Sequence, residues 1–432
     1  MNRMEEEWED YQWQLQQYEK AHRNENSGAT DQYKDGTLAV DVGTMFVKLA
    51  HNGNGILATR EGARSTFAGI IQPPDGEEVL MGQRAFEKFW ELDPKTTSMA
   101  RSSAAEENTE EILMKVVSPS IQDAVERAGL DHSKMRSIVT VPPTAVQDTQ
   151  DKNNPWNHTH NNDTWKTAEW IPEPVAAVWG AQVHGELPLH DLNKPVLVID
   201  MGASMTSLSV VQRDVVLTNV SLDFGAQVYV DAICDHVVES QPGLSTVKND
   251  GMAWQRLRTA AQEAVQELNT QPQAQLNIPY IGMDLETREP IHLDLRVPRQ
   301  LIEQKVADAI VTDMILKYED GSSSSILSPH VPVVPHSLSS LWMSLMTQLL
   351  TGINQQPQDL GHVLVVGGGA KHQMVESTIK ECFGFFQTEV VLPALSTRSE
   401  LVALGASSLL PQYEYHFDKG LVRLEGEATA EA

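Results

Sequence analysis

The first residues carry a helical repeat of apolar positions. Large apolar side chains recur at alternating intervals of four and three residues, at Met4, Trp8, Tyr11, Leu15 and Tyr18. This spacing is typical of one stripe along an amphipathic helix. The stripe covers barely two heptads, so the helix either folds back on its own domain or docks onto a partner. The polar, turn-forming residues 24–36 that follow predict a linker.

After the linker the pattern changes to apolar runs of β type that end in Asp or Gly. The segment TLAVD, ending at Asp41, predicts a buried strand, and the segment FVKLAHNGNGILATR predicts two strands joined by an Asn-Gly turn. The same unit returns in PVLVID, ending at Asp200, before a second strand pair with a polar turn at Arg213-Asp214. A strand, an Asp-x-Gly sequence and a hairpin therefore occur twice in the chain.

Helices alternate with these strands. Residues 106–130 read as two helical segments separated at Pro119, and a helix with Pro in its first turn begins at Glu173. Amphipathic or apolar periodicity predicts further helices at residues 254–268, 301–318 and 338–350, and a short one at 398–408. A late buried strand, VLVV, runs into three consecutive glycines. The order of elements indicates a mixed α/β fold.

The composition narrows the classes of partner. Asp and Glu outnumber Lys and Arg by 59 to 32, which gives a formal charge of −27. This charge opposes binding to nucleic acid or to an anionic membrane surface. The two cysteines cannot form a disulfide framework or a four-ligand zinc site. No targeting segment or membrane span is visible, so we expect a soluble, cytoplasmic protein.

Three strand ends offer the same chemistry. They are Asp41-Val42-Gly43, Asp200-Met201-Gly202 and Gly367-Gly368-Gly369. Glycine lets the main chain approach phosphate oxygens, and an aspartate at a strand end can hold a hydrated Mg²⁺ beside them. Two such loops facing each other would clamp a triphosphate. Neither a Walker loop nor a dinucleotide-binding G-x-G-x-x-G sequence occurs in the required place.

With these motifs in view, the chain resembles the nucleotide-binding domain of the heat shock protein 70 (Hsp70) family, within the actin-like ATPase superfamily. The resemblance covers residues 37–410 in family order, through the segments LAVDVGT, IVTVPP, PEPVAAVWGA, VLVIDMGASMTSLSV, RLRTAAQEAVQELN, VLVVGGGAKHQMVE and SELVALGAS. It implies a duplicated, two-lobed α/β fold of the actin-like, ribonuclease H-like type with a central nucleotide cleft.

The resemblance also implies a division of the chain. Residues 1–36 form the N-terminal helix and linker, 37–197 form lobe I with one small subdomain shortened, and 198–394 form lobe II. Residues 395–412 contain a final helix that returns to lobe I, and 413–432 form an acidic tail. We therefore expect no peptide-binding domain of the usual kind in this chain.

The family pattern assigns roles to particular residues. Thr44 and Glu173 are the expected catalytic groups, and Asp41 and Asp200 are expected to hold Mg²⁺ through water. The residues expected to bind ATP or ADP are Asp41, Gly43, Thr44, Asp200, Gly202, Ala203, Ser204, Gln262, Gln266, Gly367, Gly368 and Gly369.

Several positions depart from the family pattern. The family's lysine near the γ-phosphate falls on Phe86, with Lys88 two residues away. Met45 and Phe46 follow the first loop where the family has small or polar residues. Two family aspartates fall on serines, and along the helix beside adenine the family's Glu, Lys, Arg and Ser fall on uncharged residues. The two serines are Ser207 and Ser399, and the helix residues are Gln262, Val265, Gln266 and Asn269. We expect reduced nucleotide affinity and, at most, a slow ATPase.

Two functional hypotheses follow. The first is an Hsp70-like protein that binds ATP or ADP with Mg²⁺, hydrolyses it weakly or not at all, and acts with chaperones or co-chaperones. The alternative is a pseudo-ATPase scaffold in which Phe46, Met205 and Phe86 partly fill the cleft and the N-terminal helix docks a partner. A phosphotransferase of the sugar-kinase type is disfavoured because no general base for a substrate hydroxyl stands out.

Overall fold

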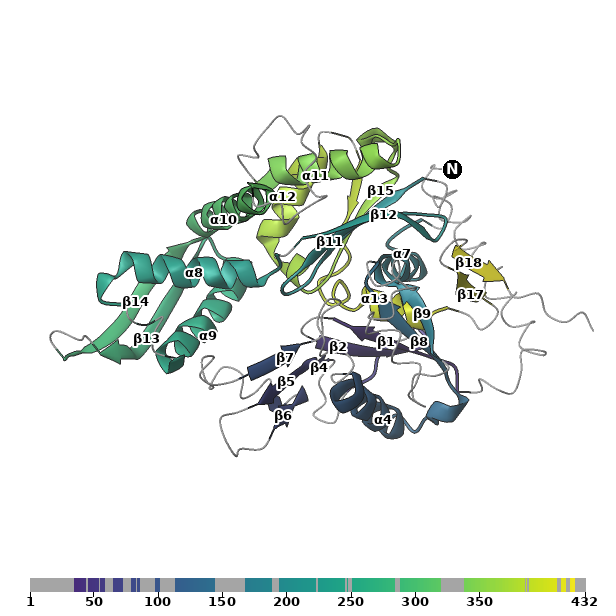
Figure 1. Ribbon diagram of the computed structural model, residues 1–432, viewed down its shortest axis with the longest axis horizontal. Helices are drawn as coiled ribbons and strands as arrows, with labels where there is room; N and C mark the ends of the chain where they lie inside the picture. The colour runs from purple at the N-terminus through teal and green to yellow at the C-terminus, as the bar shows by residue number, and fades with distance from the viewer. Residues whose placement is uncertain are drawn as a thin grey trace, which may run out of the picture.

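The computed structural model (Figure 1) has the two-sheet organisation that the repeated sequence unit predicts. It describes residues 35–43, 46–53, 55–58, 65–72, 79–82, 84–85, 98–101, 113–143, 168–188, 194–222, 224–244, 247, 251–283, 288–319, 338–384, 386, 388–409, 413–416 and 420–423. The helix predicted near the N-terminus lies outside these residues, as do Thr44, Phe86 and Lys88.

The first sheet is built around a strand that is buried along its whole length. Strand β1 (Thr37–Val42) pairs antiparallel with β2 (Phe46–His51) and parallel with β8 (Arg136–Val141), and the order is β3-β2-β1-β8-β9 with β4 beside β2. The remaining strands are β3 (Gly55–Ile56), β4 (Thr66–Phe67) and β9 (Glu169–Pro172). The apolar run of β1 is typical of a central strand that is covered on both faces.

The second sheet repeats this topology. Strand β10 (Val196–Met201) pairs antiparallel with β11 (Thr206–Gln212) and parallel with β15 (His362–Val366), in the order β12-β11-β10-β15-β16. The outer strands are β12 (Val215–Leu222) and β16 (Glu389–Val391). Each sheet therefore carries a strand with an aspartate near its carboxyl end, flanked by a returning hairpin on one side and a parallel strand on the other.

Two helices join the sheets. Helix α7 (Glu173–Val183) and helix α13 (Leu401–Ser407) cross at the centre of the molecule (Figure 1) and share one apolar cluster with strands of both sheets. A Cβ atom at Gly405 would overlap the carbonyl oxygen of Ala176 and lie 2.5 Å from the amide nitrogen of Gly180. Glycine is therefore required where the two helices meet.

One face of the first sheet is covered by helix α4 (Ser118–Arg127), which contributes Ile121 and Val125 to the core. We predicted that Pro119 separates two helices. In the structure Pro119 lies in the first turn of α4, and a π-helical segment (Leu113–Val117) runs directly into that helix. Pro at this position is tolerated because the first turn lacks intrahelical N–H partners. A small sheet of order β6-β5-β7 lies beside β4, and its strands are Leu80–Met81, Gly69–Gln72 and Ser98–Arg101.

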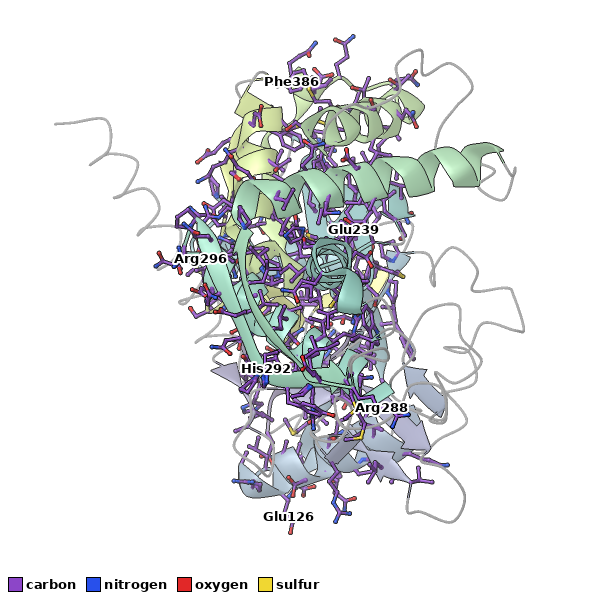
Figure 2. All side chains as sticks on the ribbon, turned by 90° about the vertical axis from the view of Figure 1, so that its left-hand side faces the viewer. Glu126, Glu239, Arg288, His292, Arg296 and Phe386 are labelled. Atoms are coloured by element: carbon purple, nitrogen blue, oxygen red, sulfur yellow. The ribbon has the colours of Figure 1, made fainter. Side chains whose placement is uncertain are left out.

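The second half of the chain adds helices around the second sheet and an arm that projects from it (Figure 1). The arm contains helices α8 (Gln227–Ser240) and α9 (Gly251–Leu268) and the hairpin of β13 (Gln273–Met283) and β14 (Pro290–Pro298). Burial alternates along the hairpin, so one face packs on α9 while the other is solvated. Figure 2 shows Arg296, His292 and Arg288 spaced along this hairpin. The other helices are α10 (Arg299–Glu319), α11 (Leu338–Gly352) and α12 (Gln373–Gly384).

The end of the chain differs from the expected acidic tail. Strands β17 (Tyr413–His416) and β18 (Gly420–Arg423) form an antiparallel hairpin, and β17 contacts β9. Two short stretches of the expected tail therefore form paired strands. The final helix begins at Leu401, three residues later than its predicted start at 398. Within the described part of the chain, no helix has the length and apolar character needed to cross a membrane.

The crossing of α7 and α13 generates a first prediction. Replacement Gly405→Ala should lower the free energy of unfolding by about 1–3 kcal/mol, because the methyl group would force the two helices apart. Urea denaturation monitored by circular dichroism measures this change. Gly352→Ala in α11 is the matched control, since an added Cβ there meets nothing within 4 Å. Equal unfolding free energies in the two variants would contradict the proposed contact.

Candidate functional site

The three loops that the sequence singles out meet at one place. Strands β1, β10 and β15 all lead into a small cavity of about 120 Å³, which Gly43, Gly202, Gly367 and Gly368 help to line. Strands β10 and β15 are parallel and adjacent, with Asp200 opposite Val366. Ligands in open α/β sheets bind beyond the carboxyl ends of the strands, and this cavity lies there in both sheets.

The first two loops are built alike. The N–H of Gly43 donates to the carbonyl oxygen of Phe46 at 3.0 Å, and the N–H of Gly202 donates to that of Met205 at 2.8 Å. Each turn sends the chain back along the strand that it has just left. We call them the first and second aspartate turns, Asp41–Phe46 and Asp200–Met205.

The third loop packs directly on the second aspartate turn. Gly367 has φ of 95°, and a Cβ there would overlap the carboxylate of Asp200. A Cβ at Gly369 would lie 2.6 Å from the carbonyl oxygen of Gly202. The glycines at both positions are required, because any side chain would push the loop away from the aspartate turn.

A buried arginine supports the third loop from behind. The guanidinium of Arg398 donates to the carbonyl oxygens of Ala370 at 2.7 Å and Pro393 at 3.0 Å, and the carbonyl oxygen of Arg398 accepts from the N–H of Gly367 at 3.1 Å. Burial lowers the pKa of Arg398, and the nearby carboxylate of Glu376 opposes that effect. The guanidinium remains charged at neutral pH. Sequence reasoning missed this residue, because its partners are two main-chain carbonyl oxygens and the carboxylate of Glu376, which only the folded chain brings to it.

Three carboxylates gather at the small cavity, namely Asp41, Asp200 and Glu173. Burial raises the pKa of Asp200 to about 6, and the neighbouring charge of Asp41 adds to this effect. Burial also raises the pKa of Glu173 well above its ordinary value, and Asp200 and Asp41 raise it further. The cavity therefore favours a bound cation, which would relieve the repulsion among these groups.

Lys48 is the main site residue that the sequence analysis did not identify. It lies on β2 opposite Asp41, and its Nζ is 2.9 Å from Asp41 Oδ2. Asp41 Oδ1 accepts from the hydroxyl of Thr140 at 3.2 Å. Burial lowers the pKa of Lys48, but the charge and hydrogen bond of Asp41, together with the charges of Asp200 and Glu173, outweigh burial, so the pKa is raised overall. The sequence could have indicated Lys48 through the register of the predicted hairpin, which places this residue opposite Asp41.

A divalent cation fits this site through water. Within the described ranges, no group of three His, Cys, Asp or Glu side chains converges as a direct metal cage. Mg²⁺, however, usually keeps several waters and binds one or two carboxylates together with phosphate oxygens. Asp41 and Asp200 line the same cavity and can supply those two carboxylates.

A second, larger cavity of about 690 Å³ adjoins the first. Helix α9 contributes Gln262, Gln266 and Asn269 to its wall, and the third loop contributes Gly368 and Gly369. The residues that line both cavities are Gly43, Lys48, Gly202, Gly368 and Ser399. The two spaces together form one elongated site with a charged end and an amide-rich end.

The amide-rich end contains an imidazole in a defined setting. Nδ1 of His372 lies 2.9 Å from the side-chain oxygen of Asn269, and the ring centroid of Tyr229 is 5.5 Å from that of His372. Burial lowers the pKa of His372 to about 4, so the ring is neutral at physiological pH. Nδ1 then donates to Asn269, which leaves Nε2 as an acceptor. This end of the site is therefore polar without a permanent charge on the imidazole.

Most of the residues expected to bind nucleotide lie at these two cavities. The small cavity is lined by Asp41, Gly43, Glu173, Asp200, Gly202, Gly367 and Gly368, and the larger one also by Ala203, Gln262, Gln266 and Gly369. Ser204 belongs to the second aspartate turn but lines neither cavity. Thr44 lies outside the described residues. The individual roles of these residues remain predictions.

The repeated sheets, with the cavities between them and two helices crossing behind, define the actin-like ATPase fold. A family model described as Hsp70 protein matches residues 177–319, from within α7 to the end of α10. This match supports membership of the Hsp70 family over that part of the chain, which holds the second aspartate turn and helix α9. The relationship indicates a nucleotide-binding, chaperone-like function.

The environment of Arg398 generates a second prediction. Arg398→Met should lower the free energy of unfolding by about 1–3 kcal/mol, because two buried carbonyl oxygens would lose their donor. Hydrogen exchange at the amides of residues 367–371 should also become faster. Arg398→Lys should restore part of the stability, since it keeps a charged donor.

The matched control is Arg296→Met on β14, where the side chain is exposed and bonds to Gln275. Surface changes of this kind usually alter stability by no more than about 0.5 kcal/mol. Equal effects of the two methionine variants on unfolding and exchange would rule out the supporting role of Arg398.

Proposed function

We propose that this protein binds ATP or ADP with Mg²⁺ in the elongated site and hydrolyses the nucleotide weakly or not at all. The phosphates would occupy the small cavity, and the nucleoside would occupy the larger one. The observation that carries this proposal is the continuity of the two cavities, which share Gly43, Gly202 and Gly368. Glycines at the junction let main chain from three loops approach one ligand.

The charged end supports a metal-bound phosphate. A bound Mg²⁺ would neutralise phosphate oxygens and orient them in the cleft. The carboxylates of Asp41 and Asp200 would hold its water shell from the two sheets. Glu173, which begins α7 between them, would hold water or a proton at its carboxyl group beside the phosphates.

The amide-rich end supports a base and sugar. Gln262, Gln266 and Asn269 present neutral donors and acceptors from one face of α9. Neutral amides bind a purine more weakly than a stacked guanidinium with charged partners would. We therefore propose that the protein binds ATP or ADP with modest affinity and prefers a nucleotide whose base and sugar are unmodified.

The described cleft favours nucleotide binding over a filled, scaffold-type cleft. The scaffold alternative requires Phe46 and Met205 to occupy the nucleotide space. Phe46 lines the larger cavity, but its ring packs edge-on against Phe67, with centroids 6.2 Å apart, and that cavity remains open at about 690 Å³. Met205 forms part of the wall of the small cavity. Phe86, the third residue in that hypothesis, lies outside the described residues.

The nucleotide would regulate contacts with other chaperones or co-chaperones. Domains of this fold carry ligand between two lobes, so a bound nucleotide can change the angle between the lobes and hence the surfaces that they expose. The test is the refolding rate of a denatured enzyme by a complete Hsp70 system, with this protein and either ATP or no nucleotide added. An effect that is independent of nucleotide would contradict nucleotide-controlled action.

A third prediction tests nucleotide binding at the third loop. Gly368 has φ of −66° and ψ of −35°, and a Cβ there meets nothing within 4 Å. Gly368→Val should therefore fold normally while its side chain enters both cavities and blocks the ligand. At a ligand concentration of a hundred times Kd, wild type should gain about 2.7 kcal/mol of stability, and the variant should gain none.

Thermal shift with ADP, ATP and Mg²⁺ makes this comparison. The control is Gly384→Val at the end of α12, where an added Cβ also meets nothing within 4 Å and the residue lines neither of the two cavities. This control should keep the wild-type ligand response. If nucleotide stabilises Gly368→Val as much as wild type, the nucleotide does not bind in these cavities.

A fourth prediction concerns hydrolysis. The family position for the lysine beside the γ-phosphate holds Phe86. Phosphoryl transfer depends mainly on positioning and charge stabilisation, and the loss of one key electrostatic group slows such reactions by roughly a thousandfold. Single-turnover formation of ADP by the purified protein should therefore be slower than that of an intact Hsp70 by about that factor. A rate equal to the intact enzyme, unchanged by Thr44→Ala, would show that the residues are misassigned.

A further inference from the structure

We propose that Lys48 is the residue that contacts the phosphates in this cleft, and that it supplies the positive charge absent from position 86. The inference rests on the proposed nucleotide function and assigns the phosphate contact to a residue of the first sheet. It concerns binding of the phosphates rather than their hydrolysis, because Lys48 is fixed to the first aspartate turn.

The position of Lys48 suits this role. Its Nζ is held 2.9 Å from Asp41 Oδ2, at the carboxyl end of β1. Lys48 lines both cavities, so its ammonium lies along the path that a phosphate chain would take from the small cavity to the larger one. Among the described residues that line the small cavity, it is the one basic side chain.

The charge balance requires a cation at this place if an anion is to bind. Three carboxylates, from Asp41, Asp200 and Glu173, line the small cavity with a single ammonium. These carboxylates repel an entering phosphate, and the ammonium of Lys48 reduces that repulsion together with the charge of a bound Mg²⁺. The ammonium carries three N–H donors, and one of them is directed to Asp41. The other two can serve phosphate oxygens without breaking that pair.

The second aspartate turn shows that folding alone does not demand a lysine here. Asp41 faces Lys48 across the β1–β2 hairpin, whereas Asp200 faces Ser207 across the equivalent β10–β11 hairpin. The same turn, with a carboxylate in the same place, therefore forms with a neutral hydroxyl opposite the aspartate. The lysine is an addition to one of two otherwise equivalent turns, and the ligand that crosses from one turn to the other accounts for it.

The experiment compares ligands that differ only in their phosphates. Isothermal titration with adenosine, ADP and ATP at saturating Mg²⁺ is run on wild type, Lys48→Met and Lys48→Arg. Lys48→Met should weaken ADP and ATP by about tenfold or more, as expected for loss of a charge-assisted hydrogen bond, and leave adenosine unchanged. Lys48→Arg should recover part of the lost affinity. Lys134→Met, which removes an exposed lysine paired with Asp131, should match wild type.

The outcomes separate this inference from the proposed function. Absence of ADP and ATP binding to wild type overturns both. Wild-type binding with unchanged ADP affinity in Lys48→Met overturns the role of Lys48 alone, and an equal loss for adenosine and ADP does the same. If Lys48→Met does not fold by circular dichroism, Lys48→Gln replaces it, since an amide keeps a donor to Asp41 without the charge. The same selective loss for ADP and ATP is then required.

Discussion

The contact between Gly180 and Gly405 sets the distance between the two sheets. Helices α7 and α13 touch through main-chain atoms there, so each helix can pack at once on strands of both sheets. The apolar cluster that results includes Ile138 of the first sheet and Val198 of the second. The carboxyl ends of β1 and β10 face one another because this central layer is thin. Both cavities depend on that separation.

Around this layer, a strand, an aspartate turn and a hairpin occur twice, and the two copies differ in the group that contacts the aspartate. Both aspartate turns close with the same main-chain hydrogen bond, and Asp41 is buried while Asp200 is half-buried. The first copy is neutralised by Lys48, whereas the second is covered by the third loop, whose Gly367 lies against Asp200. The result is a site with positive charge on one wall and bare main chain on the other. Such a site suits a ligand that is both charged and extended.

The sequence predicts those parts of the structure that short segments determine by themselves. The strand ending at Asp41, the turn at Asn52-Gly53 and the strand ending at Asp200 each carry their own turn and burial signals, and each is confirmed. The third glycine loop is predicted for the same reason. The family match supports the Hsp70 relationship over residues 177–319, which include the strand ending at Asp200.

The missed residues depend on partners that are distant in sequence or on the opposite strand. Lys48 becomes part of the site only through the register of β2 against β1. Arg398 does so through the carbonyl groups of Pro393 and Ala370 and the carboxylate of Glu376. His372 acquires its neutral state from burial beside Asn269 and Tyr229. The hairpin of β17 and β18 has weak local signals, so its residues resembled an acidic tail. The sequence predicts that Pro119 separates two helices, because a π-helical turn before α4 has no sequence signature.

The bonds that α13 makes with the first sheet have a consequence for the order of synthesis. The hydroxyl of Thr37 donates to the carbonyl oxygen of Leu409, across 372 positions of the chain, and the N–H of Gly53 donates to the hydroxyl of Ser407. Strand β1 is synthesised before α13, so the face of the first sheet that α13 shares with α7 is only partly covered until residues 401–409 emerge. During translation that exposed apolar surface must be kept from aggregating. A nascent chain of this protein is therefore itself in need of protection while it is made.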